Sequence, residues 1–232
     1  MTTKQTIPAL RFSFLTRFYD RVLSATLPEE RFKRRLVAQL APRPGQRILD
    51  LGCGTGTLTL LIKQACPKAE VLGLDADIDA LRIARLKTEA AGCRIGFCQS
   101  LAHPAPLRLH SLDGIASSLF FHHLASCEKL RALECARKLL KPGGQFHIAD
   151  WGRPHNLWMR LAFLGVQLLD GFETTRDSVQ GRLIPLMEEA GFQLVCETER
   201  EKTVFGTLSL YRAETQASRK WTGSLGRVGR PV

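Results

Sequence analysis

The feature that most constrains the fold is a regular alternation of short apolar runs with stretches of helical spacing. The apolar runs predict strands at 47–50, 70–75, 94–98, 114–119 and 144–150. The stretches between them predict helices at 56–66, 78–91 and 126–140. Short apolar strands that alternate with helices are typical of a parallel sheet with helices on both faces.

This alternation ends in two strand-like runs, 192–199 and 203–212, which a short charged turn separates. Two such runs predict an antiparallel pair. The chain is therefore expected to be an α/β protein with a seven-stranded, mostly parallel sheet whose last strand is antiparallel.

Helices are also expected before the sheet, at 12–25 and 28–41. Within the alternating region, Asp77 and Ser126 are predicted as helix N-caps, and Gly92 is placed to end a helix.

The charge of the chain is its most unusual bulk property, with a net +11 over 232 residues and a pI near 9.7. Such a charge attracts nucleic acid, anionic lipid or acidic substrates. The basic residues cluster at 31–35 and in the last fifteen positions, which is typical of a solvated helix face and a basic tail. Because 217–232 lack periodicity, the segment 215–232 is expected to be a disordered basic tail.

Cysteine spacing and hydropathy argue against other classes of protein. The seven cysteines are scattered, without a CxxC pair or a Cys/His spacing, so neither a metal site nor a disulfide framework is expected. The longest apolar stretch, 157–169, contains Arg160 and Gln167 and is too short to cross a bilayer. A cytoplasmic protein is expected.

A glycine-rich turn follows the first predicted strand, in the sequence "ILDLGCGTGTLTLLI" at 48–62. Asp50 ends the strand, and Gly52, Gly54 and Gly56 let the backbone adopt positive φ and let a ligand approach it. Asp75 ends the next strand, where a carboxylate can accept hydrogen bonds from both ribose hydroxyls. In open parallel sheets ligands bind beyond these strand ends, so the pattern predicts a nucleoside site.

The spacing of the glycines separates two kinds of nucleoside cofactor. Dinucleotide-binding turns have the pattern G-x-G-x-x-G. This chain has G-x-G-x-G, with Thr57 where the third glycine of the dinucleotide pattern stands, which weakens an NAD interpretation.

Four motifs in order, "LDLGCGTG", "LGLDAD", "LLKPGGQFHIAD" and "FGTLSLYRA", carry a family resemblance. Together they resemble a class I S-adenosylmethionine-dependent methyltransferase of the small-molecule branch that includes the ubiquinone/menaquinone-type enzymes. The resemblance covers about residues 30–213 and implies a Rossmann-like fold and S-adenosylmethionine as the cofactor.

The resemblance also implies which residues bind the cofactor. The resemblance assigns the methionine end of the cofactor to Asp50, Gly52, Cys53, Gly54 and Gly56. It assigns the ribose of the cofactor to Asp75 and the adenine to Ala76.

The sequence departs from the family after the third strand, where an Asp–Ala pair usually meets the adenine amino group. By spacing, the acid position falls on Leu101. Gln99 or Ser100 could replace the acid, or backbone groups alone could hold the adenine.

Candidate acceptor-site residues follow the fourth and fifth strands. His122 and His123 come after the fourth, and Asp150 ends the fifth. A neutral imidazole can take a proton from an acceptor that must lose one. The alternative is that one histidine bonds to a loop backbone and the other is solvated.

An apolar substrate pocket is expected beside these residues. Its predicted lining is Phe120, Phe121, Trp151, Leu161 and Leu164. The last two belong to the apolar segment 154–172, which is expected to be a lid over the methyltransferase domain 42–214, together with the helices of 1–41. The alternative for that segment is a helix that only caps the core.

These features favour a methyltransferase that acts on a small, apolar acceptor such as a quinone, polyketide or lipid precursor. Nucleic acid is not the expected partner, and peripheral membrane contact is left open. An RNA methyltransferase that uses the basic surface is one alternative, but aromatic stacking platforms beside the charge are scarce. A degenerate cofactor-binding domain at membranes is another, and no pattern predicts an oligomeric state.

Overall fold

The computed structural model describes residues 29–154, 172–203 and 206–217, and their core is one seven-stranded sheet with the order β3-β2-β1-β4-β5-β7-β6. The strands are β1 Arg47–Leu51, β2 Glu70–Asp75, β3 Gly96–Gln99, β4 Leu112–Ser118, β5 Leu140–Trp151, β6 Gln193–Thr203 and β7 Gly206–Glu214. The first five pair in parallel, whereas β7 is antiparallel to both of its neighbours, β5 and β6. The predicted fold class is confirmed.

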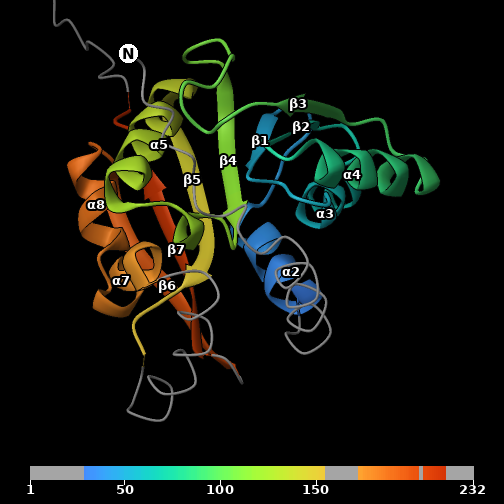
Figure 1. The fold of residues 1–232 in the computed structure, drawn as a ribbon. Helices are drawn as coiled ribbons and strands as arrows, with labels where there is room; N and C mark the ends of the chain where they lie inside the picture. Colours follow the sequence, from blue (N-terminus) through green and yellow to red (C-terminus); the bar gives the residue numbers. More distant parts are fainter. Residues whose placement is uncertain (1–28, 155–171, 204–205, 218–232) are drawn as a thin grey trace, which may run out of the picture.

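Helices cover both faces of this sheet (Figure 1). They are α2 Glu29–Leu40, α3 Thr57–Ala65, α4 Ile78–Ala90, the 3-10 helix η2 Phe121–His123, α5 Ser126–Leu139, α7 Phe172–Gln180 and α8 Leu183–Glu189. Figure 1 shows α2, α3 and α4 on one side of the sheet and α5, α7 and α8 on the other. The helix expected at 12–25 lies outside the described residues.

Each face has its own apolar core. On one face, Phe32 and Leu36 of α2 pack with Leu58 and Ile62 of α3, and all four side chains are buried. These positions recur every three or four residues, which places them on one side of each helix. The second core lies between the sheet and the pair α5 and α8, and contains Leu133, Phe146 and Met187.

Two of the three predicted helix-end residues are confirmed. Asp77 caps α4 and accepts hydrogen bonds from the backbone N–H groups of Asp79 and Ala80 at 2.8 and 3.3 Å. Gly92 follows α4 with φ +66°. Ser126 is not a cap: its hydroxyl donates to Asp177 Oδ2 at 2.6 Å, because a buried carboxylate competes for it.

The turn of the final hairpin lies later than the sequence predicts. Glu201 and Lys202 remain in β6, opposite Leu208 and Thr207. Charged residues fit there because β6 is the edge strand, and α2 supplies arginine partners for Glu201. The sequence patterns described above also do not predict helices α7 and α8.

Among the residues that the structure describes, no helix is long and apolar enough to cross a membrane.

Candidate functional site

The glycine turn follows β1 and lies on the carboxyl end of β2. Gly52, Gly54 and Gly56 have φ values of +70°, +50° and +76°, as the sequence predicts for this turn. The N–H groups of Gly52 and Cys53 donate to the Leu74 carbonyl at 2.8 and 3.0 Å. These bonds fix the path of the turn between the two strands.

The three glycines have different surroundings. A side chain on Gly52 would lie 2.3 Å from the Phe120 ring, and one on Gly56 would lie 2.8 Å from Ala84 Cβ. A side chain on Gly54 would meet nothing within 4 Å. Gly54 therefore presents an open backbone surface to a ligand. Cys53 is buried, which raises the pKa of its thiol, so it is not a nucleophile at neutral pH.

Asp50 is fully buried at the end of β1. Its Oδ2 accepts a 2.6 Å hydrogen bond from the Thr59 hydroxyl, whereas Oδ1 has no hydrogen-bond partner in the described structure. Desolvation raises the pKa of Asp50 to about 6, and the bond from Thr59 and the charge of Lys33 moderate this rise. A buried carboxylate oxygen without a partner is costly, which points to a donor on a ligand.

Asp75 lies beside the turn at the end of β2. Its Oδ2 accepts from the Gly54 N–H at 2.7 Å, and its Oδ1 accepts from the Asp77 N–H at 2.9 Å. Each oxygen keeps a second lone pair for a ribose hydroxyl.

The three candidates for the adenine end lie at the tip of β3, which Gln99 ends. Gln99 Nε2 donates to the Ala76 carbonyl at 3.3 Å, and the Ser100 N–H donates to the Asp75 carbonyl at 2.9 Å. Leu101 is 56% exposed. The structure thus brings Gln99 and Ser100 to the backbone of Ala76 and Asp75, the residues that the sequence assigns to the adenine and the ribose.

Lys87 of α4 is a residue of this region that sequence reasoning missed. Its Nζ donates to the hydroxyls of Thr55 and Thr57 at 3.2 and 2.9 Å, on both sides of Gly56. Desolvation, reinforced by the charge of Lys33, lowers the pKa of Lys87. Lys87 follows the turn by about thirty residues in sequence, so no local sequence pattern predicts their contact.

The residues around the turn fit S-adenosylmethionine. Asp50 Oδ1 offers an acceptor to the ammonium group of its methionine end, and Gly54 offers an uncovered backbone. Asp75 has lone pairs for the ribose, and Ala76 and Gln99 stand where the adenine is expected.

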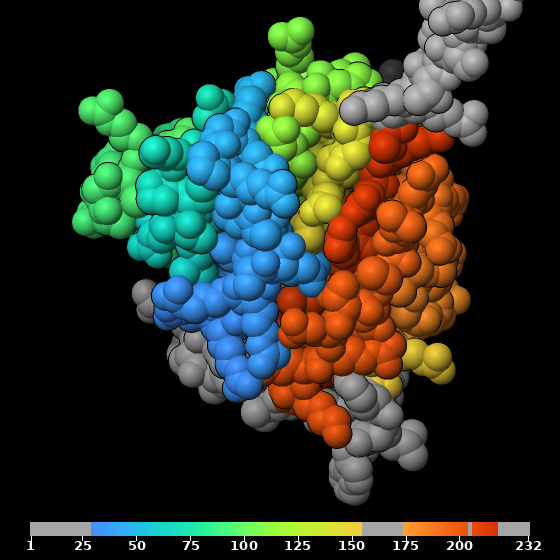
Figure 2. Space-filling model, turned by 180° about the vertical axis from the view of Figure 1, so that it is seen from behind, coloured from blue at the N-terminus to red at the C-terminus, as the bar shows by residue number. Residues whose placement is uncertain are grey.

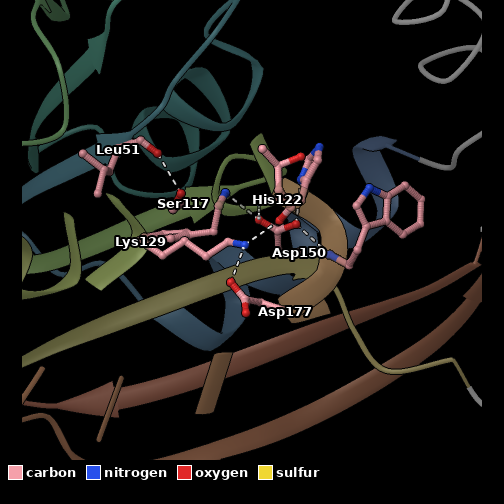
Figure 3. Close-up of polar contacts among 9 residues, drawn as sticks. Leu51, Ser117, His122, Lys129, Asp150 and Asp177 are labelled. Carbon is pink, nitrogen blue, oxygen red and sulfur yellow. Dashed lines mark hydrogen bonds and ion pairs between the residues drawn. The ribbon is translucent and has the colours of Figure 1, made fainter. Parts of the chain in front are cut away.

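His122, which follows β4, and Asp150, near the carboxyl end of β5, form a buried pair (Figure 3). His122 Nδ1 lies 2.7 Å from Asp150 Oδ1. The same carboxylate accepts from the N–H groups of Phe121, His122 and Trp151 at 2.7, 3.3 and 2.7 Å. Burial alone would raise the pKa of Asp150, but His122 and these bonds lower it below its ordinary value.

An ionised Asp150 sets the tautomer of His122. Nδ1 carries the hydrogen that points to the carboxylate, so Nε2 is the basic nitrogen of the neutral ring. The alternative from the sequence is that one histidine bonds to a loop backbone and the other is solvated; His122 instead is buried and contacts the Asp150 carboxylate.

The other predicted acceptor-site residues have different environments. The His123 ring lies against the His122 ring, with centroids 3.9 Å apart and a tilt of 45° between the ring planes. Phe120 lies on Gly52, whereas Phe121 is in the core against Phe146, with centroids 6.0 Å apart. Trp151 is buried at the end of β5. Leu161 and Leu164 lie outside the described residues.

A second buried pair, Lys129 and Asp177, joins α5 to α7 in the same cluster (Figure 3). Lys129 Nζ lies 2.9 Å from Asp177 Oδ2 and donates to the Thr174 carbonyl at 2.6 Å. Since α7 lies against η2, this pair fixes the helix that flanks His122. Sequence reasoning missed it because the partners are 48 residues apart.

Comparison with known proteins agrees with this geometry. The pattern of a family described as "Methyltransferase domain" matches residues 48–144. An uncharacterized methyltransferase of Synechocystis sp. is 34% identical over 170 residues, which cover 72% of this chain and 76% of that protein. A ubiquinone/menaquinone biosynthesis C-methyltransferase of Syntrophotalea carbinolica is 30% identical over 193 residues, which cover 76% of this chain and 80% of that protein.

Solved structures share the fold at lower identity. An S-adenosylmethionine-dependent methyltransferase from Aquifex aeolicus matches with a TM-score of 0.59 and 21% identity, covering 83% of this chain and 91% of that chain. Phosphoethanolamine N-methyltransferase 2 of Haemonchus contortus matches with a TM-score of 0.64 and 14% identity, covering 80% of this chain and 52% of that chain. From its motifs, fold and relatives together, the chain belongs to the class I S-adenosylmethionine-dependent methyltransferases, in the branch of the ubiquinone/menaquinone-type enzymes.

Proposed function

We propose that this methyltransferase acts on a small, apolar acceptor with an ionisable hydroxyl or activated carbon, of the quinone, polyketide or lipid-precursor type. The observation that carries the proposal is the buried His122–Asp150 pair at the carboxyl ends of β4 and β5. S-adenosylmethionine supplies a methyl group that is already activated as a sulfonium. The protein therefore has to align the acceptor, exclude water and, where the acceptor must lose a proton, accept that proton.

His122 is the proposed base. Asp150 holds its Nδ1–H and stabilises the imidazolium that forms when Nε2 takes a proton from the acceptor. Phe120 stands between this pair and the glycine turn, because its ring lies on Gly52. An acceptor beside Phe120 would be next to both the cofactor turn and the base. His123, whose ring lies against that of His122, is proposed to help position it.

The flanks of the segment 154–172 support its proposed role as a lid. Before it, Trp151 donates its N–H to Asp150, and Arg153 packs near Gly181, where a side chain would lie 3.5 Å from Arg153 Cβ. After it, α7 lies against η2, which carries His122. Both flanks thus lie beside the proposed base, and Leu161 and Leu164 are proposed to cover an apolar acceptor there.

The basic residues of α2 do not favour an RNA substrate. Arg31, Arg34 and Arg35 each have an acidic partner, which offsets part of this charge. We propose a cytoplasmic enzyme, and contact with a membrane surface is compatible with an apolar acceptor.

The experiment is transfer of labelled methyl from S-adenosylmethionine into a host extract that is then divided into organic-soluble and RNA fractions. We expect label in the organic fraction, and we expect Asp75→Ala to abolish it. His122→Gln should lower the rate by roughly 10²- to 10⁴-fold while leaving the affinity for S-adenosylhomocysteine within twofold, since a base acts on the acceptor. His110→Gln, at an exposed histidine, is the matched control.

Label in RNA would contradict the proposed acceptor class. Cofactor binding without label in either fraction would instead indicate a domain that binds S-adenosylmethionine without turnover.

A further inference from the structure

The first turns of α2 lie at the same edge of the sheet as the cofactor turn. Arg31 and Arg35 contact Glu201 at 3.6 and 3.5 Å. Glu201 pairs with Leu208, which in turn pairs with Trp151 at the carboxyl end of β5. Figure 2 shows α2, in blue, beside these C-terminal strands, in red. This part of α2 is therefore level with the ends of β1 and β4.

Lys33 is buried in this part of the helix, although the sequence pattern places it on a solvated basic face. The residue is 8% exposed, whereas the side chain of its neighbour Arg34 is 62% exposed. Lys33 Nζ contacts the carboxylate of Glu29, one turn earlier on α2. A lysine is rarely buried without a partner, and this partner belongs to the same helix.

Lys33 belongs to the helix that packs on α3, and α3 begins directly after the glycine turn. Desolvation is the largest influence on the pKa of both Asp50 and Lys87, and the charge of Lys33 lowers both values. Lys33 therefore lies within electrostatic reach of the carboxylate that ends β1 and of the lysine that holds Thr55 and Thr57. Lys87, unlike Lys33, already donates to the hydroxyls of Thr55 and Thr57.

The methionine end of the cofactor carries two opposite charges, an ammonium and a carboxylate. Asp50 Oδ1, buried and without a hydrogen-bond partner in the described structure, offers an acceptor only to the ammonium. The carboxylate needs a cation at the same end, since a buried charge is stable only when it is paired. Lys33 has the right sign and position, and Glu29 is half-buried and can turn to solvent.

We propose that Lys33 of α2 binds the α-carboxylate of S-adenosylmethionine, exchanging its contact with Glu29 for one with the cofactor. Helix α2 is then part of the cofactor site as well as of the core. The proposal concerns the cofactor alone and does not depend on the nature of the acceptor.

The test is isothermal titration of the full chain with two ligands. S-adenosylhomocysteine has the amino-acid end, whereas 5′-methylthioadenosine keeps the adenosine and the thioether but lacks that end. We expect Lys33→Met to weaken S-adenosylhomocysteine by roughly ten- to a hundredfold and methylthioadenosine by less than twofold, because a charge-assisted hydrogen bond is lost only with the first ligand.

Two further variants sharpen the comparison. Arg34→Met removes a positive charge from the exposed side of the same helix and should change neither affinity. Lys33→Arg keeps the charge and should recover most of the affinity for S-adenosylhomocysteine.

Equal weakening of both ligands by Lys33→Met would overturn the proposal, because it would show that Lys33 only supports the fold. Unchanged affinity for S-adenosylhomocysteine would overturn it as well. Failure of the unaltered protein to bind either ligand would overturn the cofactor assignment and the role of Lys33 together. The ratio of the two affinities is measured within each variant, so a general loss of stability cannot imitate the expected result.

Discussion

Thr59 satisfies one carboxylate oxygen of Asp50 with a 2.6 Å hydrogen bond and leaves the other oxygen without a hydrogen-bond partner in the described structure. The bond approaches from α3, which begins directly after the glycine turn. One helix thus fixes the orientation of the carboxylate and directs its second oxygen away from the protein's own donors. The side chain is prepared for an external donor before the ligand arrives.

Cofactor binding should depend on pH through Asp50. Its pKa is about 6 in the unliganded protein, so the carboxyl becomes neutral below that pH and loses its attraction for the ligand's ammonium. We expect the affinity for S-adenosylhomocysteine to fall about tenfold per pH unit below pH 6. Titration calorimetry from pH 5 to 8 measures this, and methylthioadenosine, which lacks the ammonium, should not follow the same slope.

Asp50→Asn provides the control, since its side chain does not ionise. A slope that persists in this variant would assign the pH dependence to another group.

The same raised pKa has an opposite consequence for folding. A carboxyl whose pKa rises from 3.8 to about 6 on folding is most favourable to the folded state below pH 3.8. That contribution is lost as pH rises to 6, by about 3 kcal/mol at most. Asp50→Asn should remove this fall in the free energy of unfolding of the unliganded protein, as measured by urea denaturation. An unchanged pH dependence would contradict the raised pKa.

Gly52→Ala should destabilise the protein more than an ordinary glycine substitution at positive φ. The new Cβ would lie 2.3 Å from the Phe120 ring. The alanine would also have to adopt the unfavourable φ of +70°. We expect the free energy of unfolding to fall by about 2–4 kcal/mol, from backbone strain and overpacking together. Denaturation by urea measures the loss.

Gly45→Ala is the matched control, because Gly45 has φ +77° and nothing within 4 Å of the added atom. It should cost about 1 kcal/mol. In the Gly52→Ala background, Phe120→Ala should recover part of the loss, and additive effects of the two changes would contradict the contact.

His147 should make stability fall as pH decreases. It is buried in β5, where Gln39 Nε2 donates to Nδ1 at 2.9 Å and Nε2–H donates to the Gln145 side chain at 3.2 Å. Desolvation, with the charge of Arg212, lowers its pKa from 6.5 to about 4. A histidine held neutral stabilises the fold fully above pH 6.5 and loses this contribution between pH 6.5 and 4.

The contribution of neutral His147 to the free energy of unfolding is about 3 kcal/mol. It is measured as the difference between the pH dependences of the unaltered protein and His147→Gln, with His110→Gln as a surface control. Parallel curves for the unaltered protein and His147→Gln would show that His147 does not carry the effect.

Lys129 and Asp177 should show strong coupling in a double-mutant cycle. Asp177→Leu alone leaves a buried ammonium without its counter-charge and should cost about 3–5 kcal/mol. Lys129→Met together with Asp177→Leu replaces the pair by apolar groups, so the double variant should be more stable than Asp177→Leu. Urea denaturation of the four proteins gives the coupling energy, and a value near zero would contradict the ion pair.

The parts of this protein that sequence reasoning predicts are those set by local pattern. The glycine turn, Asp75 at the tip of β2 and the cap at Asp77 depend on residues close together in the chain. The His122–Asp150 pair was within reach because parallel strands end at one edge of the sheet. Only the structure, however, gives the bond between them.

The parts that escaped prediction depend on distant contacts. Lys33 has the pattern of a surface residue because Arg31, Arg34 and Arg35 flank it, and its burial follows from how α2 packs on α3. Ser126 has the chemistry of a cap, but Asp177, far along the chain, takes its hydroxyl. Lys202 remains in a strand because β6 lies at the edge of the sheet.

The contacts of Gln39 have a consequence for how the chain is assembled during synthesis. This residue near the end of α2 donates to the Tyr211 carbonyl and accepts from the Thr198 hydroxyl, across 172 and 159 positions of sequence. A growing chain makes α2 well before these partners. The ribosome must therefore release the final hairpin before the first helix can reach its finished position, and contacts of such range make that docking a late step of folding.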